Sequence, residues 1–168
     1  MSLDDAVRPE KEAGPDDLVK ERELAAKLAS GCPDAKMSVS NISRRRIWLV
    51  ADPAGIRHVF GWAKEEWPDI HLSTISGLDD GDAMEVIYHF VLDQVLVNMK
   101  VRVDREHPEV HSISDMIPAA DSYERELHDL LGVEFTGRTS TPRLVLPDEW
   151  EDGVYPLRKE RKEDEKSV

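Results

Sequence analysis

The feature that most constrains the fold is a long run of alternation between apolar and other residues at positions 84–103. Every second residue is apolar over 84–92, and the same period resumes over 95–103 after Asp93-Gln94. A period of two is the side-chain spacing of a β-strand, and two such runs joined by two residues are typical of a β-hairpin. We therefore expect an antiparallel hairpin with one buried face and one mixed face.

The sequence around this hairpin predicts helices and shorter strands. Helices are expected where apolar residues recur at steps of three and four, at positions 18–28, 53–67 and 118–131. Shorter strands are expected at 37–40, 46–50, 70–75 and 110–113. The predicted fold class is α+β, with an antiparallel-rich mixed sheet covered by helices and followed by an extended C-terminal arm.

Four segments are expected along the chain. They are a flexible N-terminus at 1–14, the α+β domain at 15–132, the arm at 133–159 and a disordered tail at 160–168. The arm shows no helix or strand period, yet it carries apolar residues that lose free energy when they stay in water. Two arrangements satisfy that chemistry: the arm wraps its own domain, or it lies on another protein.

Charge and cysteine content exclude several classes of protein. The formal net charge is −13, which argues against a nucleic-acid binder because such proteins neutralise phosphates with Lys and Arg. The single cysteine, Cys32, excludes an internal disulfide and a self-contained iron–sulfur cluster. No apolar run has the length of a signal-peptide core or a membrane span, so neither is expected.

Catalytic motifs are scarce. The sequence holds no GxGxxG, no GxxxxGK[ST], no HExxH and no GxSxG pattern. His89, His107 and His111 lie on or just after the hairpin, and with Asp93 and Asp115 they suggest a metal site of a small metal-dependent hydrolase. The favoured interpretation is that these histidines face solvent or make single hydrogen bonds, as an isolated His on a mixed strand face usually does, and the metal site is the alternative.

The third predicted helix is crowded with charge. Arg125 and Asp129 are four residues apart, as are Glu124 and His128, so each pair shares a helix face. The simplest interpretation is a solvated helix surface with weak ion pairs, because acid–base catalysis needs a desolvated pocket that this spacing does not supply.

At this helix the sequence resembles the 30 kDa subunit family of respiratory complex I, the NADH–quinone oxidoreductase. The family motif begins E-R-E, continues with an acid and two apolar residues, and ends on a basic residue or proline and two apolar residues. The positions in register are Glu124, Arg125, Glu126, Asp129, Leu130, Leu131, Pro142, Leu144 and Val145. Arg138 stands where His or Lys is usual and keeps the positive charge, and a Pro-Leu-Arg-Lys element follows at 156–159.

The resemblance implies an accessory subunit with no flavin, quinone or iron–sulfur cluster of its own. Such a subunit docks on the hydrogenase-like large subunit (the 49 kDa type of complex I) beside an iron–sulfur subunit, and it supports assembly. It lies on the cytoplasmic face of the membrane, peripherally attached through partner subunits. Relatives of the family occur in energy-converting hydrogenases, formate hydrogenlyases and archaeal deazaflavin-dependent dehydrogenases. A generic adaptor that shares only the motif is a further possibility.

On this interpretation the charged helix and the arm form the surface that binds a partner. The expected contact residues are arginines and acids that make ion pairs and large side chains that act as anchors. They are Glu124, Arg125, Glu126, Asp129, Arg138, Arg143, Trp150, Tyr155, Leu157 and Arg158.

Overall fold

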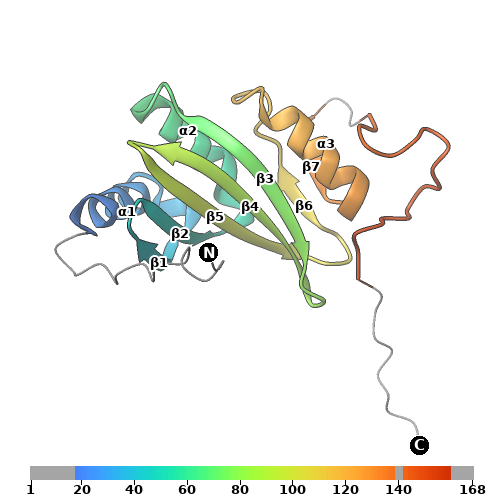
Figure 1. Cartoon of the computed structure of the whole chain (residues 1–168), viewed down its shortest axis with the longest axis horizontal. Helices are drawn as coiled ribbons and strands as arrows, with labels where there is room; N and C mark the ends of the chain where they lie inside the picture. The colour runs from blue at the N-terminus through green and yellow to red at the C-terminus, as the bar shows by residue number, and fades with distance from the viewer. Residues whose placement is uncertain (1–17, 139–141, 160–168) are drawn as a thin grey trace, which may run out of the picture.

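A five-stranded sheet with the order β1-β2-β5-β4-β3 forms the centre of the computed structural model, which describes residues 18–138 and 142–159 (Figure 1). Its longest strands are β4 (Ala83–Leu92) and β5 (Val95–Asp104), which pair antiparallel along their full lengths. The hairpin predicted from the sequence is confirmed. The segments expected to be flexible at 1–14 and disordered at 160–168 lie outside the described residues.

The remaining strands complete a mostly antiparallel sheet. β1 (Ser38–Ser43) pairs antiparallel with β2 (Arg46–Ala51), and β3 (His71–Asp79) pairs antiparallel with β4. β2 pairs parallel with β5, which makes the sheet mixed. A separate parallel pair is formed by β6 (Glu109–His111) and β7 (Glu134–Thr136).

Three α-helices are present in the described part of the chain: α1 (Val19–Gly31), α2 (Ile56–Glu66) and α3 (Ala120–Leu131). Short 3-10 turns, η3 (Pro33–Ala35) and η4 (Pro53–Gly55), stand before β1 and α2. The carboxylate of Asp52 accepts a hydrogen bond from the Ala54 N–H and starts the second of these turns. The predicted α+β class is confirmed.

The core lies between one face of the sheet and the helices. The alternate residues of β4 on this face, Met84, Val86, Tyr88, Phe90 and Leu92, are buried. The Phe60 ring of α2 packs on them, with ring centroids 5.3 Å from Tyr88 and 5.1 Å from Phe90. Burial of this apolar face is the main source of stability, since each such side chain is worth about 1.5–3 kcal/mol.

The helix α3 packs over the outer part of the same face because β3 carries a glycine there. A Cβ at Gly77 would lie 2.4 Å from a Leu131 methyl carbon and 2.8 Å from a Leu127 methyl carbon. The Tyr123 hydroxyl donates to the Ser73 carbonyl at 2.9 Å and ties the helix to the same strand. Glycine therefore permits the close approach that fixes the position of α3.

Two expectations need correction. The sequence predicts no strand after residue 132, but β7 lies at Glu134–Thr136 and pairs with β6. Val133 and Phe135 are consequently buried in the core. The third helix begins at Ala120 rather than at Pro118, and the N–H groups of Ala120 and Asp121 donate to the carbonyls of Ile117 and Pro118 in the turn before it.

Candidate docking surface

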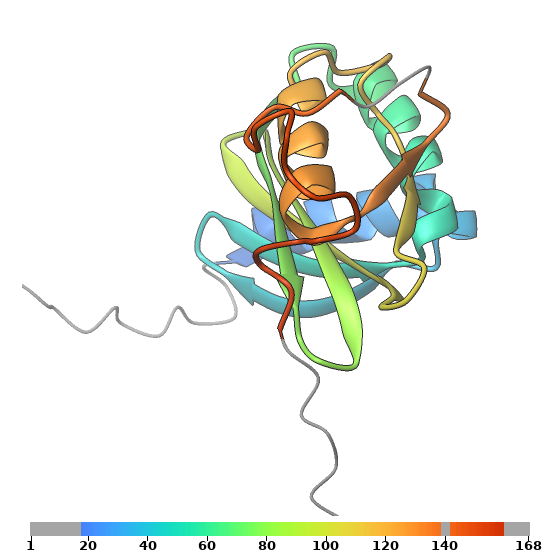
Figure 2. The same cartoon turned by 90° about the vertical axis from the view of Figure 1, so that its right-hand side faces the viewer.

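Of the predicted arm, residues 133–138 include β7, and residues 142–159, called the arm from here on, lie across α3 and end at the tip of β3 (Figure 2). The Arg125 guanidinium of α3 donates to the carbonyls of Pro142 and Arg143, each at 2.9 Å. Farther along, the Leu157 N–H donates to the Leu130 carbonyl at 3.0 Å. The arm is thus held to its own domain mainly through its backbone groups. Of the two arrangements that the sequence leaves open, this is the one in which the arm packs on its own domain.

Asp129 is the main attachment point for the first half of the arm. One oxygen of its carboxylate accepts from the backbone N–H groups of Leu144, Val145 and Leu146 at 2.8, 2.8 and 3.2 Å. Burial of Asp129 raises its pKa, but these N–H groups outweigh the burial and hold the pKa below its ordinary value. The carboxylate therefore stays ionised and fixes the direction in which the arm leaves the helix.

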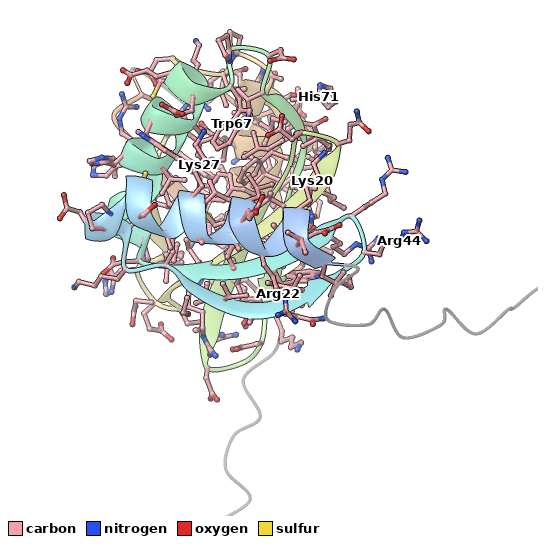
Figure 3. The ribbon with its side chains drawn as sticks, turned by 90° about the vertical axis from the view of Figure 1, so that its left-hand side faces the viewer. Lys20, Arg22, Lys27, Arg44, Trp67 and His71 are labelled. Carbon is pink, nitrogen blue, oxygen red and sulfur yellow. The ribbon has the colours of Figure 1, made fainter. Side chains whose placement is uncertain are left out.

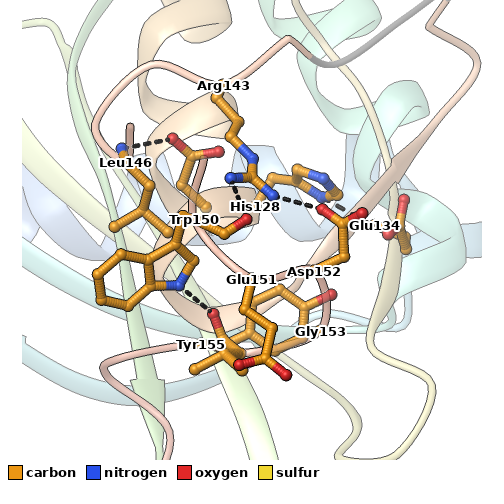
Figure 4. Close-up of a pocket in the computed structure, with 11 residues that line it drawn as sticks. His128, Glu134, Arg143, Leu146, Trp150, Glu151, Asp152, Gly153 and Tyr155 are labelled. Atoms are coloured by element: carbon orange, nitrogen blue, oxygen red, sulfur yellow. Dashed lines mark hydrogen bonds and ion pairs between the residues drawn. The ribbon is translucent and has the colours of Figure 1, made fainter. Parts of the chain in front are cut away.

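Arg143 closes the arm into a loop. Its guanidinium donates to the carbonyls of Pro147 and Trp150 at 2.9 and 2.7 Å and forms an ion pair with the Asp152 carboxylate (Figure 4). The Trp150 indole N–H donates to the Val154 carbonyl at 2.9 Å. Beneath this loop lies a hollow of about 330 Å³, lined in part by His128, Glu134 and Tyr155 of the surrounding elements.

The second half of the arm is anchored at the end of α3. Gly132 ends the helix in the left-handed conformation, with φ +70°, and a Cβ there would lie 2.5 Å from the Tyr155 ring. Arg158 donates through Nε to the Leu131 carbonyl at 2.7 Å and stacks 4.7 Å from the Tyr155 ring centroid. Tyr155 and Arg158 therefore hold the arm in place, and both side chains remain partly exposed to solvent.

A clamp that the sequence does not reveal fixes the far end of the arm. The Asp79 carboxylate, at the end of β3, accepts two hydrogen bonds from Arg105 at 3.0 and 2.9 Å and one from the Lys159 N–H at 2.9 Å. Arg105 also donates to the Lys159 carbonyl at 2.7 Å. The hydrogen bonds from Arg105 lower the Asp79 pKa to about 2. No local pattern links these residues, because they come from three distant parts of the chain.

The structure places Glu124 inside the protein rather than on the surface expected to meet a partner. Its side chain is fully buried and accepts from the Ile113 N–H, the Ser112 hydroxyl and Arg138 at 2.8, 2.6 and 2.8 Å. Arg138 also donates to Asp121 at 2.6 Å. Burial raises the Glu124 pKa, and the three donors offset only part of that rise. Glu124 and Asp129 are both buried in this chain, so each lies beneath the surface and helps to position it.

The surface shows both apolar and charged side chains to solvent, the charged ones including Asp148, Glu149 and Glu151. Leu157 is 58% exposed and Trp150 is 37% exposed. Their neighbours on the arm include three further exposed apolar side chains, so that the apolar arm patch consists of Leu144, Val145, Trp150, Val154 and Leu157. Glu126 lies exposed on α3. An apolar patch held in a fixed shape and bordered by charge is typical of a protein-binding surface.

The metal-site alternative finds no support in the geometry. His89 is engaged by the Asn98 side-chain oxygen at 2.7 Å and the Ser76 hydroxyl at 3.1 Å, and His111 contacts the Thr136 hydroxyl at 2.7 Å. Within residues 18–138 and 142–159, no group of three or more His, Cys, Asp and Glu side chains is placed to hold a metal ion. In the same residues, no helix is both long and apolar enough to cross a membrane.

Comparison with known proteins points to one family. Residues 49–167 match the family model described as the respiratory-chain NADH dehydrogenase 30 Kd subunit. The membrane-bound hydrogenase subunit beta of Pyrococcus furiosus is 28% identical over 152 residues, which cover 86% of this chain and 88% of that protein. A subunit of the F(420)H(2) dehydrogenase of Methanosarcina mazei is 31% identical over 143 residues, which cover 83% of this chain and 90% of that protein.

A solved structure shows the same fold. One chain in the structure of the membrane-bound sulfane sulfur reductase, an archaeal respiratory membrane complex, superposes with a TM-score of 0.70 at 25% identity, covering 83% of this chain and 84% of that one. The resemblance seen in the sequence of α3 thus extends over most of the molecule. The chain belongs to the 30 kDa subunit family of respiratory-chain NADH dehydrogenase, whose members are subunits of complex I-like and hydrogenase-type complexes.

Proposed function

We propose that this chain docks on the hydrogenase-like large subunit of a complex I-like electron-transfer complex and supports the assembly of that complex. The observation that carries the proposal is that the arm is held to its own domain by backbone hydrogen bonds while apolar side chains of the arm stay exposed. Backbone N–H groups of the arm are bound by the domain, with Asp129 accepting three of them, whereas five of its apolar side chains are exposed. The patch is therefore rigid before a partner arrives, so that little conformational entropy is lost on binding.

Trp150 and Leu157 are the anchors in this proposal. They lie on two stretches of the arm that are fixed separately, one by the Arg143 loop and one by the Arg158 contact with α3. Tryptophan is among the residues enriched at the centres of interfaces, where it contributes most of the binding energy. Glu126 and the partly exposed Arg125 add polar contacts at the rim of the same surface.

In this proposal the chain takes no part in electron transfer itself. It binds no flavin, quinone or iron–sulfur cluster, and it is attached to the cytoplasmic face of the membrane through partner subunits, next to an iron–sulfur subunit. The named relatives are subunits of larger membrane complexes, which supports such an accessory role.

Capture from solubilised membranes tests the proposal. Tagged full-length chain, expressed in its own organism, is expected to recover the hydrogenase-like large subunit, identified by mass spectrometry. A chain that ends at Arg138 keeps β7 and the Glu124 contacts but lacks the arm, and it is expected to recover none. Equal recovery of the large subunit by both chains would show that the arm is not the docking surface. A purified chain with visible absorption from a bound cofactor would contradict the accessory role.

A further inference from the structure

A cluster of positive charge lies at the end of the molecule away from the arm. Three consecutive arginines form and flank the turn between β1 and β2, and two more basic residues come from the first turns of α1 (Figure 3). The basic residues at this end are Lys20, Arg22, Arg44, Arg45 and Arg46, of which Arg44, Arg45 and Arg46 line a common hollow and form the arginine cluster. Among the described residues, none of these five side chains has an ion-pair partner, although the whole chain carries a net charge of −13.

The turn that presents the arginines is held in a conformation that arginine does not favour. Arg45 has a φ of +59°, a region where glycine and asparagine are usual. The turn is fixed from three sides: the Arg45 N–H donates to the buried Glu21 carboxylate at 2.6 Å, its carbonyl accepts from the Leu96 N–H at 2.9 Å, and its Nε donates to the Gln94 carbonyl at 3.4 Å. Backbone strain of this kind gathers at binding sites, where surrounding contacts impose it.

The arginines surround a shallow hollow with an apolar part. Its volume is about 570 Å³, and its wall combines the three arginines with Gln94, Val91 and Leu96. Val91 and Leu96 face each other across β4 and β5 as a registered pair. The hollow therefore offers guanidinium groups, which bind carboxylates through two parallel hydrogen bonds, next to apolar surface.

We propose that this hollow binds a carboxylate-rich, partly apolar segment of a partner protein, at a second docking site separate from the arm. Asp or Glu side chains of the segment would pair with Arg44 and Arg46, and an apolar side chain between them would cover Val91 and Leu96. A protein segment suits the site better than an anionic membrane or a nucleic acid. A membrane or a nucleic acid extends past the cluster and is repelled by the net negative charge of the rest of the chain. A short peptide segment contacts only the cluster, and at physiological ionic strength charges more than about 8 Å away are largely screened.

Binding of a synthetic peptide tests the site. The probe is a short labelled peptide in which Glu alternates with Leu and Val, and its binding to the full chain is followed by fluorescence anisotropy. We expect the peptide to bind, and its affinity to fall as the salt concentration is raised. The Arg44→Glu/Arg46→Glu variant is expected to bind it at least about tenfold more weakly than the parent chain. Arg44→Lys/Arg46→Lys keeps the charge without the fork of donors and is expected to bind with intermediate affinity.

Matched variants separate the site from overall charge. Lys36→Glu/Arg102→Glu changes the net charge by the same amount at two exposed side chains. They lie near the ends of β2 and β5 that are farthest from the arginine cluster. This variant is expected to bind the peptide like the parent chain. Arg45→Gly removes one guanidinium while relieving the positive φ, so it folds at least as well as the parent and binds more weakly.

Several outcomes would overturn the site. One is that Arg44→Glu/Arg46→Glu lowers the affinity for the peptide no more than the control Lys36→Glu/Arg102→Glu does. Another is no peptide binding at low salt. A third is binding of phosphatidylglycerol–phosphatidylcholine vesicles in place of the peptide, which would assign the cluster to a lipid surface. None of these results depends on the arm, so that the proposed docking on the large subunit stands or fails separately.

Discussion

At the scale of single residues, Asp79 joins three distant parts of the molecule. Its carboxylate, buried at the end of β3, accepts from Arg105 and from the Lys159 N–H of the arm. The Arg105 hydrogen bonds lower its pKa to about 2 from the ordinary value of 3.8. A carboxyl group whose pKa is depressed on folding stabilises the fold above its unfolded pKa, and this stabilisation is lost as the pH falls through the folded value.

We therefore expect Asp79 to contribute about 2 kcal/mol at neutral pH, and this contribution to disappear between about pH 4 and pH 2. Asp79→Asn should lose this stability at pH 7 and should show a flatter decline of unfolding free energy in acid. Denaturant unfolding at a series of pH values measures both effects. Asp69→Asn, on an exposed side chain, is the control. Parallel acid profiles for the parent and Asp79→Asn would contradict the assignment.

Glu124 gives the opposite pH dependence, because burial raises its pKa. Arg138→Met removes the cation that faces the buried carboxylate, and it is expected to cost about 3 kcal/mol at pH 7. The cost should shrink as the pH is lowered, because the Glu124 pKa rises further in the variant and the carboxyl group then takes up a proton. Unfolding measured at pH 7 and pH 5 tests this.

The matched control for that prediction is Arg102→Met, which breaks an exposed ion pair with Asp80. Such a pair is worth about 0–1 kcal/mol, so that the control should be nearly neutral. A loss for Arg138→Met that is as small as the control, or that does not change with pH, would show that Glu124 is not a buried carboxylate held by Arg138.

These residues also mark the limit of what the sequence can predict. Spacing places Glu124 and Asp129 on a helix, but a helix surface that faces solvent and one that is covered by the arm carry the same i,i+4 pattern. The burial of Glu124 depends on a contact with Ser112, and that of Asp129 on a contact with Leu144 in the arm, which follows an irregular path. Helix spacing predicts neither contact. Trp150 and Leu157, which the sequence identifies as partner anchors, are exposed on the arm.

At the scale of elements, periodic segments are predictable and short ones are not. β4 and β5 are each ten residues long, and the period of two runs through almost the whole of each strand, which is long enough to identify the hairpin. β7 has only three residues, too few to show any period, and its strand character comes from pairing with β6. The arm has no period at all, because side chains of α3 and β3 satisfy its backbone N–H groups instead of a neighbouring strand.

The burial of β7 makes a prediction about where the domain can be cut. A chain that ends at Arg138 should unfold cooperatively, because Val133, Phe135 and the Glu124–Arg138 pair remain. A chain that ends at Gly132 loses all of these, and the loss of Phe135 alone is expected to cost about 3–5 kcal/mol. Thermal unfolding of the two chains measures the difference.

Equal melting temperatures for the two truncated chains would mean that β7 adds nothing to the fold. Loss of cooperative unfolding in the chain that ends at Arg138 would show instead that the arm is required for the domain. Either result would move the boundary between the domain and the arm, which the sequence pattern places at residue 132.

At the scale of the whole molecule, the two candidate surfaces lie at opposite ends of the sheet (Figure 1). The arm patch is apolar and fixed on α3, and the arginine cluster is cationic and fixed beside α1. A subunit with this arrangement can contact two neighbours at once, one mainly through apolar burial and the other through charge. Binding at the arm should therefore depend only weakly on salt, whereas binding at the arginine cluster should depend on it strongly.

The central claim, docking through the arm patch, is tested most directly by the affinity of this chain for the purified hydrogenase-like large subunit. Trp150→Ala/Leu157→Ala is compared with Val19→Ala/Val39→Ala, which truncates two side chains that are also exposed but lie on α1 and β1. We expect the arm variant to bind roughly thirtyfold more weakly or worse, since an interface anchor is worth about 2 kcal/mol or more. The control should bind like the parent. Equal dissociation constants for the arm variant and the parent would contradict the account.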